Sequence, residues 1–269
     1  MNQESRRGRS GLATGVCALA LLTAGIYLER LDAPGPQPEG ITSDGVHLWV
    51  ADFQTARIYR MDTQTGEVVT SYPAPGPHPE GLAWDGTHLW NGDWETRLIY
   101  RLAVSDSELV IDRELPTPRG GRPVGLTWDG EALWLTTWSP FYLFRLDPVT
   151  GDTLKSRSLQ DSDDLLYPAV SARPEDLAWD GSQLCITDWF TREVHRVHPE
   201  SLMVTRTLGS GGPRSVGLAF HFGHLWNGDT GDGGIAPALY KLDVTDGTVP
   251  VRKTTWGLLK ARDWSGKNP

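Results

Sequence analysis

The sequence is poor in cysteine, with only Cys17 and Cys185 among its 269 residues. Cys17 lies in an apolar stretch near the N-terminus, where we interpret it as a small apolar residue. Cys185 therefore has no disulfide partner in the folded part, and packing alone must hold the fold together. The sequence also shows no Ser-His-Asp order, glycine-rich phosphate loop or Cys/His metal spacing. No short motif by itself indicates an enzyme class.

Basic residues are also scarce, with 25 Lys and Arg against 34 Asp and Glu, a net charge of −9. An acidic surface repels the phosphate backbone of nucleic acids, so we expect no nucleic-acid partner. Such a surface suits a cationic or neutral small molecule, or a peptide N-terminus. We expect the protein to be a monomer.

Long hydrophobic runs are absent apart from one, at residues 11–28, which follows Arg6, Arg7 and Arg9. This order is typical of a targeting segment, and the run is just long enough to span a bilayer as a helix. A cleaved signal peptide and an uncleaved signal anchor both remain open. Either would place the rest of the chain outside the cytoplasm, periplasmic or secreted. We assign residues 1–33 to this segment and a short spacer, and residues 34–269 to one folded domain.

The folded part consists of five copies of one repeat. Matching positions at residues 40, 81, 125, 176 and 217 are separated by 41, 44, 51 and 41 residues, the period of propeller blades. In the second copy we predict strands at 81–84, 87–92, 97–102 and 108–115, with a hairpin turn at Asp85-Gly86. The prediction is an all-β, five-bladed propeller of four-stranded antiparallel blades, preceded by an N-terminal apolar helix.

Two further features of the repeat concern packing and closure. Residues 27–40 resemble residues 68–81, so the outer strand of the last blade could come from the N-terminus or from Thr248–Trp256. We expect the C-terminal strand, because the N-terminal one would lie against a membrane anchor. One position on the second strand is tryptophan in four copies, and we expect packing between blades from Trp49, Trp90, Trp134 and Trp226.

Carboxylates recur at one face of the predicted propeller, where the first strand of a blade begins and the second ends. Converging carboxylates raise one another's pKa, so one of them could shuttle a proton near neutral pH. They could also hold Ca²⁺ or another divalent cation, or merely cap strand ends. The first strands contribute Glu39, Glu80 and Glu175, and the second strands Asp52, Asp93, Asp188 and Asp229. A metal site would use Glu39, Glu175, Asp93, Asp188 and Asp229.

Aromatic residues follow the second strands on the same face: Phe53, Trp94, Trp138 and Trp189. They could form a stacking or cation–π cage, or pack between blades. Two irregular loops share this face, Gln160–Ala172 as a possible lid and the acidic, glycine-rich Asp229–Gly234. Of the histidines, His78 is the one placed to reach this face, whereas the opposite face carries His47, His88 and His224.

The order of these motifs resembles the plant and bacterial type of glutaminyl cyclotransferase, over about residues 38–245. Glu39-Gly40-Ile41 and Glu80-Gly81-Leu82 match the Glu-Gly-Leu of its first two blades, and Trp94 and Trp189 match its tryptophans. The resemblance implies a secreted five-bladed propeller in which Glu80 is the proton shuttle. The chain departs from this pattern at Val124, where the family has Trp, at Glu175, where it has Asn, and at Asp229–Gly234, which lacks its Lys.

Three hypotheses follow. The leading one is an extracytoplasmic cyclotransferase-like enzyme that cyclises an N-terminal glutamine without a cofactor. Glu80 would be catalytic, and the substrate would contact Trp94, Trp138, Trp189, Phe53 and Glu175. The second is a divalent-metal-dependent lactonase or hydrolase, because the blades are also similar to those of gluconolactonase-type propellers, a resemblance that implies Glu39 as a metal ligand. Streptogramin-lyase-like propellers share the repeat style too. The third is a non-catalytic ligand- or protein-binding propeller.

Overall fold

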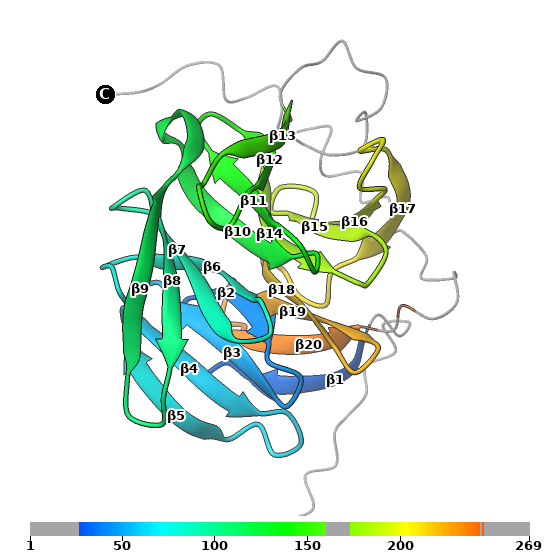
Figure 1. The fold of residues 1–269 in the computed structure, drawn as a ribbon. Helices are drawn as coiled ribbons and strands as arrows, with labels where there is room; N and C mark the ends of the chain where they lie inside the picture. Colours follow the sequence, from blue (N-terminus) through cyan, green and yellow to red (C-terminus); the bar gives the residue numbers. More distant parts are fainter. Residues whose placement is uncertain (1–26, 160–172, 243, 245–269) are drawn as a thin grey trace, which may run out of the picture.

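The computed structural model describes residues 27–159, 173–242 and 244, and it has the predicted all-β architecture. Five four-stranded antiparallel sheets are arranged around a common axis as the blades of a propeller (Figure 1). Within each blade the strands follow one another from the axis outward, each hydrogen-bonded to the next. The only helical element in the described residues is a short 3₁₀ turn, η1 (Pro118–Gly120).

The strand bounds agree with the predicted ones to within a few residues. Blade 1 contains β2 (Pro38–Ser43), β3 (His47–Asp52), β4 (Arg57–Asp62) and β5 (Val68–Pro73). Blade 2 contains β6 (Pro79–Trp84), β7 (His88–Asp93), β8 (Leu98–Val104) and β9 (Leu109–Pro116). Blade 3 contains β10 (Arg122–Trp128), β11 (Leu133–Trp138), β12 (Tyr142–Leu146) and β13 (Thr153–Ser158). Blade 4 contains β14 (Pro174–Trp179), β15 (Leu184–Asp188), β16 (Glu193–Val197) and β17 (Val204–Gly209).

Blade 5 joins the two ends of the described chain. Its strands are β18 (Ser215–His221), β19 (His224–Asp229), β20 (Ala238–Leu242) and, outermost, β1 (Tyr27–Asp32), which pairs antiparallel with β20. The expectation that the C-terminal strand closes this blade is therefore wrong. Pairing β1 with β20 ties the start of the propeller to its last blade, so the ring is held closed by a ladder of backbone hydrogen bonds.

The N-terminal segment lies almost entirely outside the described residues. Tyr27 and Leu28, the last two residues of the apolar run, belong to β1, and so do four residues that we assigned to the spacer. The predicted apolar helix, and with it the choice between a cleaved signal peptide and an uncleaved anchor, lies outside the described residues. Across residues 27–159, 173–242 and 244 the structure contains no helix with the length and apolarity that a membrane crossing requires.

The four repeated tryptophans pack between blades, as predicted. Each is at most 2% exposed and lies in a cluster with the first strands of the following blade. Trp90 of blade 2, for example, packs with Leu126 and Leu133 of blade 3. Burial of such large rings supplies much of the interblade cohesion, which this disulfide-free domain needs.

Glycines let the innermost strands approach one another closely. A Cβ at Gly125 would lie 2.5 Å from the carbonyl oxygen of Glu175, and one at Gly81 would lie 2.5 Å from the amide nitrogen of Leu126. Only glycine fits such contacts. The beginnings of β2, β6, β10, β14 and β18 therefore converge at one mouth of the central channel.

Candidate functional site

The mouth of the channel is bordered by the second or third residue of each innermost strand. Blades 1, 2 and 4 place Glu39, Glu80 and Glu175 there, whereas blades 3 and 5 place Val124 and Val216. Glu80 is buried, and Glu39 and Glu175 are partly buried. Three acidic side chains thus share a small, largely desolvated ring with two apolar ones.

A fourth carboxyl group, that of Asp176, lies beneath this ring and was not among the predicted site residues. Its Oδ1 accepts hydrogen bonds from the amides of Leu177 (2.8 Å) and Leu126 (3.2 Å). Its Oδ2 accepts from the amides of Leu218 (2.8 Å) and Ile41 (3.2 Å). One side chain therefore links the inner strands of blades 1, 3, 4 and 5. The signal was present in the sequence, because the other four blades have glycine at this position.

The carboxyl groups perturb one another. Burial raises the pKa of Glu80 well above its ordinary value, and the charges of Glu39, Glu175 and Asp176 raise it further. The pKa of Glu175 is raised for the same reasons, with burial first. Burial also raises the pKa of Asp176, against the effect of its four amide donors. Glu80 and Glu175 therefore keep their protons to higher pH than ordinary glutamates do.

Glu39 differs from its neighbours in titrating near neutrality. Burial raises its pKa to about 7, and the charge of Asp52 adds to this effect. A hydrogen bond from Nε2 of Gln37 (2.9 Å) and the charge of Arg214 act in the opposite direction. The ring thus combines carboxyls whose pKa is raised by burial with Glu39, which titrates near pH 7, an arrangement suited to moving protons.

The aspartates that end the second strands cap turns. Asp93, for example, accepts the amides of Glu95 (3.1 Å) and Thr96 (2.8 Å) with Oδ1 and the amide of His78 (2.7 Å) with Oδ2. Equivalent bonds hold the loops of the other blades that have such an aspartate, through Asp52, Asp188 and Asp229.

The residues of the hypothetical metal site are not assembled as ligands. Throughout the part of the chain that the structure describes, no group of three or more His, Cys, Asp or Glu side chains is arranged to hold a metal ion. The aspartates of that set direct their oxygens to backbone amides, as the capping alternative expects. Glu39 and Glu175 belong instead to the ring at the channel mouth.

Trp94, Trp138 and Trp189 form an aromatic wall, and arginines of the protein itself stack on this wall. The rings of Trp94 and Trp138 are 6.0 Å apart. The guanidinium of Arg122 lies 4.6 Å from the Trp94 ring, and that of Arg173 lies 5.8 Å from both Trp138 and Trp189. These side chains therefore alternate across blades 2, 3 and 4. The cage that we considered for a ligand cation is already lined by two arginines.

The remaining residues and loops predicted for this face are Phe53, His78, the acidic loop and the proposed lid. Phe53 stacks on His78, with ring centroids 4.4 Å apart, so this histidine lies beside the mouth. The acidic loop is held by its own bonds, since Oδ1 of Asp229 accepts the amide of Gly231 (2.6 Å). The proposed lid, Gln160–Ala172, falls outside the described residues. At the opposite ends of their blades lie the strand-initiating residues His47, His88 and His224.

No protein-family model matches the chain, and no curated protein matches it. Among solved structures, glutaminyl cyclase of Myxococcus xanthus superposes with a TM-score of 0.65 over 82% of this chain and 97% of that one, at 15% identity. Virginiamycin B lyase of Staphylococcus aureus gives a TM-score of 0.48 over 80% and 69% of the two chains, at 20% identity. At 15% identity, the similarity to the Myxococcus glutaminyl cyclase shows a shared fold.

Proposed function

We propose that the chain is a cyclotransferase-like enzyme that converts an N-terminal glutamine into a five-membered lactam and releases ammonia. The observation that carries this proposal is the state of Glu80. Its side chain is 6% exposed, and no hydrogen bond from a described residue holds its carboxyl oxygens. Burial and the neighbouring carboxyls raise its pKa well above that of an ordinary glutamate, which suits it to hold a transferable proton.

The reaction needs a group that both gives and takes a proton. The α-amine nitrogen attacks the side-chain carboxamide carbon, the new C–N bond forms, and the bond to the amide nitrogen breaks. Glu80 gives its proton to the departing nitrogen and regains one from the attacking nitrogen, so it ends unchanged. Glu39, about half ionised near pH 7, is suited to taking the extra proton of an α-ammonium group before the attack.

The aromatic wall supports the same chemistry. Trp94, Trp138 and Trp189 provide flat apolar surfaces on the same face as the carboxyl ring, and Arg122 and Arg173 make cation–π contacts with them. A substrate held against them would displace water from the ring of acids, which keeps the pKa of Glu80 high. The Myxococcus glutaminyl cyclase, which has the same fold, supports the proposal only in showing that such a propeller can carry this activity.

The test is turnover of a short peptide that begins with glutamine. Turnover is measured as ammonia release and as a decrease of the peptide mass by one ammonia. Glu80→Gln keeps the shape but cannot exchange protons, so we expect kcat to fall by about 10²–10⁴. Glu67→Gln, on the exposed turn between β4 and β5, is the matched control and should retain full activity. Undiminished turnover by folded Glu80→Gln, or no turnover by folded wild-type protein, would refute the proposal.

A further inference from the structure

A second feature of the repeat lies at the opposite end of the blades, in the turns between first and second strands. In blades 1, 2 and 3 this turn carries an aspartate whose Oδ1 accepts two turn amides. Oδ2 accepts the indole N–H of the tryptophan five residues later. The indole bonds measure 2.9, 2.9 and 2.8 Å for Asp44–Trp49, Asp85–Trp90 and Asp129–Trp134.

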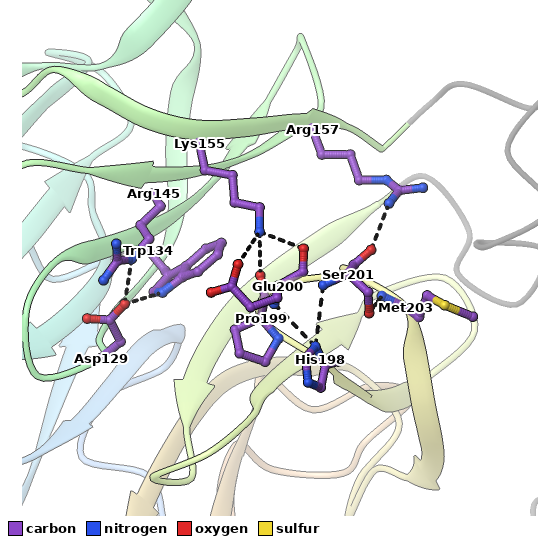
Figure 2. A network of polar contacts seen from close by, with 10 residues as sticks. All are labelled: Asp129, Trp134, Arg145, Lys155, Arg157, His198, Pro199, Glu200, Ser201 and Met203. Atoms are coloured by element: carbon purple, nitrogen blue, oxygen red, sulfur yellow. Dashed lines mark hydrogen bonds and ion pairs between the residues drawn. The ribbon is translucent and has the colours of Figure 1, made fainter.

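A basic residue completes this unit. The residue paired with the tryptophan on the third strand is Arg60, Arg101 or Arg145 in blades 1–3 and Lys241 in blade 5. Figure 2 shows the blade 3 version, in which Asp129 lies between the indole of Trp134 and the guanidinium of Arg145, 2.7 Å from Nε. In blades 1 and 2 the guanidinium lies over the indole ring instead, 5.9 and 5.8 Å from its centroid, so the cation is next to the tryptophan in each of these blades.

Blade 5 retains the indole and the cation but lacks the carboxylate. The register is unchanged, since Ala219 pairs with Trp226 as Ala83 pairs with Trp90. The aspartate position holds His221, whose Nδ1 instead lies 2.6 Å from Oγ of Ser43 in blade 1. Within the described residues the indole nitrogen of Trp226, a side chain only 1% exposed, has no hydrogen-bond partner. The same holds for Nδ1 of His224.

A cavity of about 320 Å³ lies at this turn, lined by Glu29, Thr63, Gln64, His221, Phe222, His224, Trp226 and Lys241. That volume corresponds to roughly ten water molecules at ~30 Å³ each. Phe222 is 75% exposed and has a φ of 46°, a left-handed conformation that bulky residues seldom adopt. Phe222 and Gly223 form the two-residue turn between β18 and β19, in which both residues need a positive φ, and this turn holds the exposed ring at the cavity.

We propose that this cavity binds the carboxylate of a small molecule, which takes the place of the aspartate that blade 5 lacks. The indole N–H of Trp226 and the ammonium of Lys241 would donate to the carboxylate, and Phe222 would cover the body of the ligand. Lys241 already lies 3.5 Å from Oε2 of Glu29, but its three N–H donors can serve both anions. The site is remote from the channel mouth and independent of the reaction proposed there.

The experiment uses the full chain labelled with ¹⁵N-tryptophan and follows the indole N–H signals while sodium benzoate is added. The Trp226 signal, identified by its loss in Trp226→Phe, should move downfield and saturate. The signals of Trp49, Trp90 and Trp134 are internal controls, because these indoles already donate to aspartates. Benzamide, which has the same shape but no charge, and sodium chloride should leave the Trp226 signal in place.

Two variants separate binding from a general disturbance of the fold. His221→Asp restores the carboxylate of the repeat, so it should occupy the indole N–H and weaken benzoate binding at least about tenfold, a loss of ~1.4 kcal/mol. Lys241→Met removes the cation and should weaken binding similarly. Absence of a saturable shift at tens of millimolar benzoate, or an equal response to benzamide, would overturn the proposal. Undiminished binding by folded His221→Asp would also overturn it.

Discussion

Replacing Asp176 with glycine, the residue of the other four blades, would remove the acceptor for four inner-strand amides. Three of these amides belong to other blades. A buried amide without a partner costs about 1–3 kcal/mol, giving roughly 3–9 kcal/mol for three. Two effects reduce this loss of stability: water can enter the channel and bind the amides, and the variant no longer buries a carboxyl group. We therefore expect the free energy of unfolding to fall by about 2–4 kcal/mol. For a domain of this size that lowers Tm by roughly 5–15 °C.

Asp176→Asn provides the matched comparison, since it keeps the shape and one acceptor oxygen. We expect about half the loss of Asp176→Gly, measured by urea unfolding and calorimetry. The variant also removes a charge that raises the pKa of Glu80 and Glu175, so both groups should ionise at lower pH. The limb of the activity profile that depends on protonated Glu80 should move the same way. If both variants unfold within about 0.5 kcal/mol of wild type, Asp176 does not hold the blades together.

Two further predictions concern stability. Because the pKa of Glu39 is raised from 4.5 to about 7, its stabilising contribution is complete below pH 4.5 and is lost as pH rises through 7. At 1.36 kcal/mol per pKa unit this contribution is at most about 3 kcal/mol. The free energy of unfolding of Glu39→Gln should therefore fall less than that of wild type between pH 5 and 8. An equal fall of both proteins in urea titrations would refute this prediction. Trp90→Phe should cost about 1 kcal/mol more than Trp226→Phe in equilibrium unfolding, because only Trp90 loses an indole bond, to Asp85; equal losses would contradict the difference between the blades.

The sequence was most informative where the chain repeats itself. Copies of one pattern supplied the number of blades, the strand bounds and the position of the interblade tryptophans, because each copy tests the others. Periodicity also placed Glu39, Glu80 and Glu175 at one face. It could not supply their mutual pKa effects, which depend on burial and on Asp176 beneath them.

The repeat does not predict which strand closes the ring, nor that arginines stack on the aromatic wall. The likeness of residues 27–40 to residues 68–81 indicates an N-terminal outer strand, whereas a membrane anchor directly before that strand favours the C-terminal one, so the sequence supports both. The stacking of Arg122 and Arg173 on tryptophans depends on loops in which each blade has its own length and sequence. Contacts between non-repeated segments leave no periodic signal.

Departures from the repeat are more informative about function than the repeat itself. The aspartates present in most copies cap turns, and the four tryptophans pack blades together, so both perform the same structural task wherever they occur. Asp176 and His221 each break a pattern that the other blades keep. The first adds a carboxyl group where the other blades have glycine, and the second removes one and leaves the indole N–H of Trp226 without a partner among the described residues. A duplicated scaffold can change in this way at single blades without loss of fold, because the remaining copies still supply the packing.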